Sequence, residues 1–223
     1  MTSANPTVGA VHEPALRVAA QFEEAPQQIH AAKLGMWIFL ATEVMFFGAL
    51  FFAYAIARVQ FPEAFAAASK HTNILLGTTN TAVLLTSSLF MVLAMRAAEI
   101  GLRRATAMLL VVTALLGLAF TGIKLTEYAL DYRDHLVPVL DFSFDPRYAK
   151  GALVFFGFYF VTTGLHLVHL SIGNALVLTF ARRAWLGKPN TLADQVEIVG
   201  LYWHFVDIVW IFLYPCLYLV SRT

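Results

Sequence analysis

The stretch that decides the fold is Glu197-Ile-Val-Gly-Leu-Tyr-Trp-His204-Phe-Val-Asp207-Ile-Val-Trp210, which opens an apolar run reaching almost to the end of the chain. His204 and Asp207 are three residues apart, so a helix places both side chains on one face. Ionisable side chains are costly inside hydrocarbon unless they are paired or hydrated. The fold must therefore supply partners for both groups.

The composition identifies an integral membrane protein. Of the 223 residues, 59% are hydrophobic and 13% are charged, and the mean hydropathy is +0.69. A soluble domain carries about 25% charged residues. The net charge of +1 does not favour a nucleic-acid partner. The single cysteine, Cys216, has no second cysteine for a disulfide or a cysteine-based metal site.

Five segments are long enough to cross a hydrocarbon core of about 30 Å as helices. We place them at 34–57, 74–95, 105–125, 151–180 and 199–220. Backbone groups in lipid must bond within their own segment, so all five are helical and the fold is all-α. Residues 1–33 lack the apolar centre of a secretory signal and are expected to form a cytoplasmic or interfacial segment preceding the 34–223 bundle.

Lysine and arginine in the short connections predict the orientation. Two connections that share one side of the membrane are rich in these residues: Arg96, Arg103, Arg104, Arg182, Arg183 and Lys188. An odd number of spans places the termini on opposite sides. We therefore expect a cytoplasmic N-terminus and a C-terminus outside.

Polar residues within the spans are the candidate functional groups. Glu43 lies about halfway along the first span, and His166 and His169 share one face of the fourth. The simplest interpretation is structural: a hydrogen-bonded carboxyl at Glu43, histidines bonded between helices, and a His204–Asp207 pair. Two cofactor sites are geometrically possible: a haem between opposed histidines, and a metal held by two histidines with Glu43 and Asp207. No specific ligand motif supports either site.

Small residues on the spans predict close helix packing. They are Gly77, Gly117, Gly164 and Gly173, with Thr81 and Thr121 one turn further along.

Four stretches resemble one family, subunit III of the haem–copper respiratory oxidases, and most closely the cytochrome c oxidase type. They are Lys33–Gly48 with its Thr-Glu43-Val-Met-Phe-Phe core, Glu127-Tyr128, Gly164-Leu-His166-Leu-Val-His169-Leu-Ser-Ile-Gly173, and Glu197–Trp210. They occur in the family's order and cover the chain from about residue 33 to its end.

The resemblance implies a subunit without haem or copper, since those groups are carried by partner subunits of a proton-pumping complex that reduces O2 to water. It implies contact with subunit I, association with subunit II, bound phospholipid, and a bacterial inner membrane. Glu43 matches the intramembrane carboxylate of the family's lipid cleft, and Arg182, or its neighbour Arg183, matches an arginine that contacts a lipid headgroup. The other matched polar residues are expected to be structural: Glu127, His166, His169, Glu197, Trp203, His204 and Asp207.

Full-length family members have seven helices, and this chain begins where the third would start. The five-helix form is also similar to subunit III of quinol oxidases and to an accessory protein of nitric oxide reductase. Two hypotheses from other classes stay open: a membrane redox enzyme in its own right, and a proton carrier using Glu43, His166 and His204 as a relay.

Overall fold

The computed structural model describes residues 22, 24–138, 140–187 and 192–220. Within these residues, five helices are long and apolar enough to cross a membrane: α1 (Ala25–Gln60), α3 (Ile74–Glu99), α4 (Arg103–Arg133), α5 (Ala149–Trp185) and α6 (Leu192–Tyr218). The predicted five-helix, all-α membrane bundle is confirmed. The chain also forms a short helix and a two-stranded antiparallel ribbon that the sequence did not predict: α2 (Pro62–Ser69), β1 (Leu136–Val137) and β2 (Asp141–Phe142).

The helices extend beyond the predicted spans because hydropathy marks only the part of a helix that lies in hydrocarbon. α1 already begins at Ala25, with Pro26 in its first turn, where the missing N–H costs nothing. Residues 25–33, predicted as part of a separate segment, are therefore helical. Residues 1–21 and 23 of that segment lie outside the described residues. At the other end, α4 continues to Arg133 and carries Lys124, Glu127 and Asp131 on its buried face.

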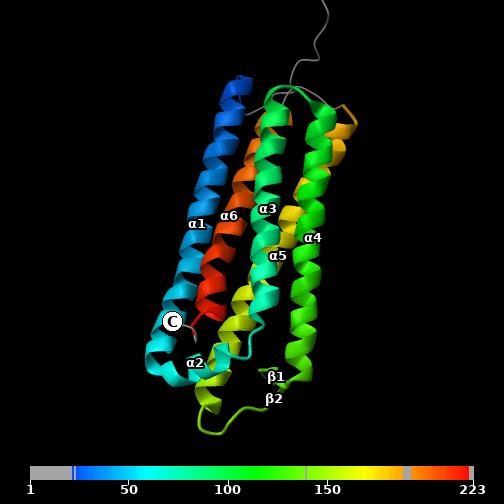
Figure 1. Ribbon diagram of the computed structural model, residues 1–223. Coiled ribbons are helices and arrows are strands. Elements are labelled where there is room, and N and C mark those ends of the chain that lie inside the picture. The colour runs from blue at the N-terminus through cyan, green and yellow to red at the C-terminus, as the bar shows by residue number, and fades with distance from the viewer. Residues whose placement is uncertain (1–21, 23, 139, 188–191, 221–223) are drawn as a thin grey trace, which may run out of the picture.

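The helices run alongside one another, with α3, α4, α5 and α6 forming the main bundle and α1 lying against α5 and α6 (Figure 1). In the most apolar window of each helix, 61% of residues are buried in α6 and only 11% in α1. α6 is therefore the central helix, and α1 is peripheral. The start of α1 marks what we call the N-terminal end of the bundle, and α2 with the ribbon marks the hairpin end (Figure 1).

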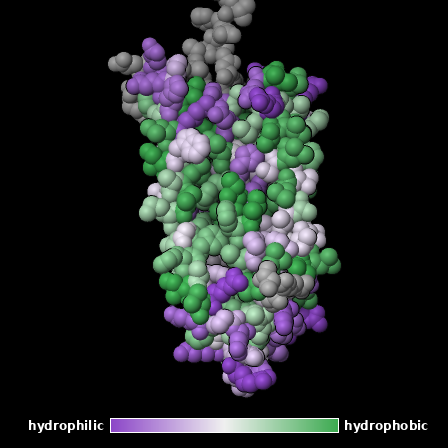
Figure 2. Space-filling view, turned by 60° about the vertical axis from the view of Figure 1, so that its left-hand side comes forward, coloured by the Kyte–Doolittle hydropathy of each residue, from purple (hydrophilic) through white to green (hydrophobic). Residues whose placement is uncertain are grey.

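The surface agrees with a membrane setting. Figure 2 shows a band of hydrophobic residues around the middle of the bundle and hydrophilic residues gathered at both ends. Large apolar side chains on the membrane-spanning helices, such as Met45, Leu115 and Phe212, are more than half exposed. This pattern leaves the band to be covered by lipid or by partner subunits.

Three of the predicted glycines let α6 side chains approach the neighbouring helices. A Cβ on Gly77 would lie 2.8 Å from a ring carbon of Tyr218, one on Gly117 would lie 2.8 Å from the ring of Trp203, and one on Gly173 would lie 3.2 Å from that same ring. The prediction of close packing holds at these positions. It is wrong for Gly164, where a Cβ would meet nothing within 4 Å, because that face of α5 does not approach another element.

At the hairpin end, two hydroxyl groups lie at backbone carbonyls near the end of α6. The Tyr54 hydroxyl of α1 donates to the carbonyl of Cys216, whereas the Thr72 hydroxyl donates to the Ser69 carbonyl at 2.8 Å and lies 3.5 Å from the Leu217 carbonyl. The last carbonyls of a helix have no partner within it. These contacts therefore join α1 and the α2–α3 connection to the central helix.

Candidate functional site

Glu43 and His169 meet at the edge where α1 crosses α5. The Oε2 atom of Glu43 lies 3.0 Å from Nε2 of His169, and Nδ1 of the same ring lies 2.8 Å from the carbonyl oxygen of Leu165. Because a carbonyl only accepts, Nδ1 carries a proton and donates it to Leu165. The contact between Nε2 and the Glu43 carboxyl then requires one more proton, held by either partner. The pair is neutral as a whole in both cases, which lowers its cost near lipid.

α6 completes this junction. The Tyr202 hydroxyl donates to the backbone carbonyl of His169 at 2.9 Å, and the Phe47 ring meets the imidazole edge-on at 5.3 Å. The side chains of Glu43 and His169 are 18% and 15% exposed, so the pair lies close to the surface of the bundle. The sequence predicted both residues as candidates, and the structure brings them together.

The predicted pair between His204 and Asp207 is wrong. Nδ1 of His204 lies 2.8 Å from the hydroxyl of Ser88 on α3, and this hydroxyl also lies close to the Asp207 carboxyl. Both carboxyl oxygens of Asp207 are buried, and neither makes a hydrogen bond of good geometry among the described residues. The imidazole bonds a residue of α3 instead of the carboxyl that follows it on its own helix. One turn further along α6, Nε1 of Trp210 donates to the Thr81 hydroxyl at 3.0 Å.

His166 occupies the apolar centre of the bundle. Its side chain is 1% exposed and lies between the rings of Phe120 and Trp210, with centroid distances of 5.5 and 5.2 Å. Neither ring nitrogen has a hydrogen-bond partner within the described chain. The sequence predicted hydrogen bonds between helices for both His166 and His169, and this prediction is wrong for His166.

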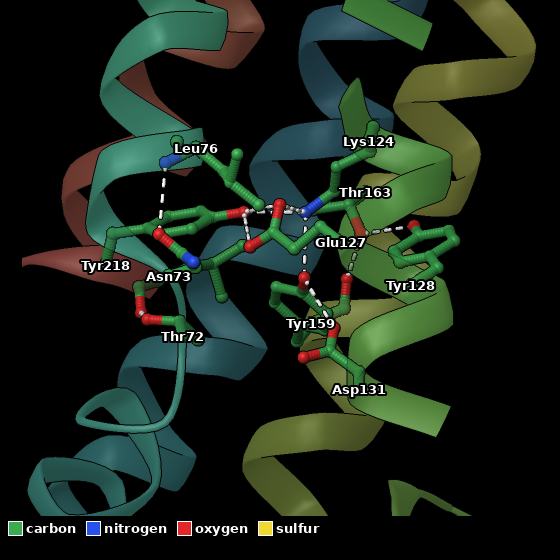
Figure 3. Close-up of polar contacts among 12 residues, drawn as sticks. Thr72, Asn73, Leu76, Lys124, Glu127, Tyr128, Asp131, Tyr159, Thr163 and Tyr218 are labelled. Carbon is green, nitrogen blue, oxygen red and sulfur yellow. Dashed lines mark hydrogen bonds and ion pairs between the residues drawn. The ribbon is translucent and has the colours of Figure 1, made fainter. Parts of the chain in front are cut away.

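A buried ionic network joins α4, α5 and α6 near the hairpin end (Figure 3). The Nζ atom of Lys124 donates to Glu127 at 3.0 Å, to the Tyr159 hydroxyl at 2.9 Å and to the Tyr218 hydroxyl at 2.6 Å. Tyr218 donates in turn to the Glu127 carboxyl, and Tyr159 donates to Asp131 at 2.9 Å. All three protons of the ammonium group are used, and the side chains of Lys124 and Glu127 are 0% and 1% exposed.

Sequence reasoning found Glu127 but missed its partners in this network, Lys124, Asp131, Tyr159 and Tyr218. Lys124 falls within the last two residues of the predicted third span, and no role was assigned to it from the sequence. A signal was available: Lys124, Glu127 and Asp131 follow one another at spacings of three and four, which places them on one helix face.

At the N-terminal end, Lys33 of α1 connects to α6. Its Nζ atom lies 2.8 Å from Glu197 and 3.6 Å from Asp194. Glu197 was predicted to fix the last helix, and this contact does so, although α6 begins earlier, at Leu192. These side chains are about a third exposed, so we expect each pair to contribute at most about 1 kcal/mol.

Two grooves open on the lipid-facing surface. One, of about 270 Å³, lies between α4 and α5; Arg182 and Trp185 line it together with apolar residues. The other, of about 640 Å³, lies between α1 and α6 with an almost wholly apolar lining that includes Phe47, Phe51 and Phe205. The neighbouring Arg183 does not line the first groove and instead lies over the ring of Phe180 at 5.4 Å.

The hairpin end has a polar cleft of about 1090 Å³ whose lining mixes both signs of charge, including Glu63, Lys70, Arg133 and Asp145. Hydrogen bonds from the side chain and backbone of Arg147 hold the pKa of the Asp145 carboxyl below its usual value. The mixed lining favours neither an anion nor a cation.

The polar groups do not converge on a metal. No group of three or more His, Cys, Asp and Glu side chains is placed to hold an ion in the part of the chain that the structure describes. Each histidine named above has a different environment: a carboxyl at His169, a hydroxyl at His204 and aromatic rings at His166. The fold and these contacts define a multi-pass membrane protein whose intramembrane polar side chains join its helices.

The comparisons with known proteins give the family. The profile of the family described as cytochrome c oxidase subunit III matches residues 20–222. The chain therefore belongs to the cytochrome c oxidase subunit III family, and it is a subunit III of a haem–copper oxidase that associates with other oxidase subunits.

The relatives include both branches of these oxidases. Cytochrome c oxidase subunit 3 of Alkalihalophilus pseudofirmus is 31% identical over 189 residues, which cover 84% of this chain and 86% of the relative. The same subunit of Branchiostoma lanceolatum is 30% identical over 191 residues, covering 82% of this chain and 67% of the relative. Subunit 3 of the cytochrome bo(3) ubiquinol oxidase of Pseudomonas aeruginosa is 29% identical over 188 residues, covering 84% of each chain.

Proposed function

We propose that this chain is the non-catalytic subunit III of a proton-pumping cytochrome c oxidase, that it contacts subunit I directly and subunit II within the complex, and that haem and copper are carried by the partner subunits. The family match over residues 20–222 is the observation that carries the proposal. The use of the buried histidines as packing and hydrogen-bonding groups supports the placement of the redox centres elsewhere.

The proposed role is to stabilise subunit I and to keep its proton-uptake entrance ordered during turnover. The test compares the whole oxidase with a preparation from which this chain has been removed. We expect the depleted oxidase to inactivate faster during turnover and to sustain less proton pumping. Equal inactivation rates and equal pumping in the two preparations would refute the role.

The proposal includes bound phospholipid, with its headgroup at Arg182 and an acyl chain in the groove between α4 and α5. The groove combines an apolar lining with a guanidinium and a tryptophan at its end, which is the arrangement expected at a membrane interface. Glu43, which lies near the bundle surface, is proposed to support proton uptake or lipid binding at the α1–α5 edge.

Paired arginine variants test the lipid site. We expect Arg182→Ala to lower the amount of phospholipid that copurifies with the oxidase, as measured by native mass spectrometry. Arg183→Ala is the matched control, because that guanidinium lies outside the groove, and it should leave the lipid content unchanged. Equal losses in both variants, or no loss in either, would contradict the assignment of the headgroup to Arg182.

We further propose that the N-terminus lies in the cytoplasm and that the membrane is a bacterial inner membrane. The end of α3, the start of α4 and the end of α5 lie at the N-terminal end of the bundle (Figure 1), and all three carry arginines, which supports this orientation. Two bacterial relatives are matched over at least 84% of both chains. Labelling of single cysteines introduced at each end, with a membrane-impermeant reagent on intact cells, tests the orientation.

The identity to a bo(3) ubiquinol oxidase subunit makes a quinol oxidase the second candidate. Oxygen consumption by the purified complex with reduced cytochrome c or with a quinol as the donor distinguishes the two.

The proton-carrier alternative is tested by Glu43→Gln. Loss of proton translocation with full retention of stability and bound lipid would favour a proton carrier over the structural role.

A further inference from the structure

Buried polar atoms without partners gather in the core of the main bundle. Among the described residues, eight such atoms belong to five side chains on α3, α5 and α6: Asn80, His166, Asn174, Trp203 and Asp207. All five residues are buried, with at most 5% of their surface exposed. Buried polar groups in proteins are almost always hydrogen-bonded, to protein or to ordered water.

These side chains occupy neighbouring levels of the core. Two contacts show that α5 and α6 run in opposite directions. Tyr202 bonds to the His169 carbonyl, and the later Tyr218 of α6 lies 6.3 Å, ring to ring, from the earlier Tyr159 of α5. His166 packs against Trp210, which follows Asp207 on α6 by less than one turn. His166 and Asp207 are therefore offset by about one helical turn along the axis of the bundle.

Asn174 and Trp203 lie further along the core, because Asn174 follows His166 by eight residues, which is about 12 Å of α5. A Cβ placed on Gly117 would meet both Trp203 and Asn174 within 2.9 Å, so those two side chains share one contact point on α4. On α3, Asn80 precedes Thr81, whose hydroxyl accepts a hydrogen bond from Trp210. The unpartnered polar atoms are therefore contributed by three helices and are spread over about two helical turns of the core.

The donors and acceptors of this set are complementary but not directly bonded. A neutral imidazole offers one donor and one acceptor, a carboxyl group offers acceptors, and the amides of Asn80 and Asn174 offer both. A water molecule donates and accepts, and buried waters typically make about three hydrogen bonds to otherwise unpaired groups. Fully buried Phe120, Trp203 and Trp210 around the region exclude a larger ligand.

We propose that the core between α3, α5 and α6 binds internal water molecules, with the His166 imidazole and the Asp207 carboxyl as their principal ligands. The site is separate from the lipid grooves and from the Glu43–His169 contact, and it does not depend on the proposed function. Water-mediated bonds between α5 and α6 would then replace the direct His204–Asp207 pair that the sequence favoured.

A cryo-EM map of the intact oxidase, at a resolution that shows ordered water in its other subunits, tests the proposal directly. We expect density within about 3.2 Å of a ring nitrogen of His166 and of a carboxyl oxygen of Asp207. A direct bond between the two side chains, or apolar packing with no such density, would overturn the proposal.

Radiolytic footprinting provides an independent readout, because radicals formed from bound water oxidise adjacent side chains even when these are buried. We expect Trp210 to be oxidised several-fold faster than Met91, a fully buried control of high intrinsic reactivity. Asp207→Leu should lower the rate at Trp210 several-fold, while Asp207→Asn should preserve it. If Asp207→Leu fails to assemble, the wild-type comparison decides: oxidation of Trp210 no faster than Met91 contradicts the proposal.

Discussion

Replacement of Lys124 by methionine is the perturbation whose cost follows most directly from the structure. The ammonium group makes three hydrogen bonds of 2.6 to 3.0 Å, and its removal leaves the Glu127 and Asp131 carboxyls buried without their cation. Breaking a buried ion pair by removing one partner costs about 3–5 kcal/mol. For a chain of this size each kcal/mol lowers a melting temperature by about 2–4 °C. We therefore expect a decrease of about 10 °C.

The assay is the melting temperature of this subunit in the purified oxidase in mild detergent. Lys70→Met is the matched control, because Lys70 is exposed, and it should shift the temperature little. The double variant Lys124→Met/Glu127→Gln should recover part of the loss, since the amide is neutral and still accepts from the Tyr218 hydroxyl. A small shift in Lys124→Met, or full additivity of the two single substitutions, would refute the reasoning.

Three further outcomes are expected. Gly117→Val should lower the free energy of unfolding by about 1–3 kcal/mol, and with it the melting temperature, because the added carbons would overlap the Trp203 ring. Gly164→Val is the control, because a Cβ at Gly164 meets nothing within 4 Å. Tyr54→Phe should cost about 1 kcal/mol and speed amide exchange in the last turn of α6, as hydrogen–deuterium exchange would show. Ser88→Ala should also cost about 1 kcal/mol by removing the partner of His204, and unchanged stability would contradict that contact.

The candidate site was predicted only in part, for a reason that differs between residues. Glu43 and His169 stand out in sequence because an ionisable side chain inside an apolar span is rare, yet their pairing depends on where α1 crosses α5. Lys124 was overlooked because a lysine near the end of a span is expected to reach water. In the structure, α4 continues past it and the side chain turns into the core instead.

The pairing of His204 shows the same limit at short range. The three-residue spacing of His204 and Asp207 places both side chains on the same face of α6. The spacing does not show which residues of the neighbouring helices pack against that face. α3 presents Ser88 at 2.8 Å from the imidazole, so the local pair is replaced by a contact between helices.

The number of spans, their helical state and the family are properties of the sequence itself, because hydrocarbon tolerates only long apolar segments with internally bonded backbones. Which polar groups meet was decided by the tertiary structure. Lys33 meets Glu197 and Glu43 meets His169 across more than a hundred residues of sequence. Such contacts depend on the relative rotation and depth of packed helices, and the periodicity of a single helix does not encode either quantity.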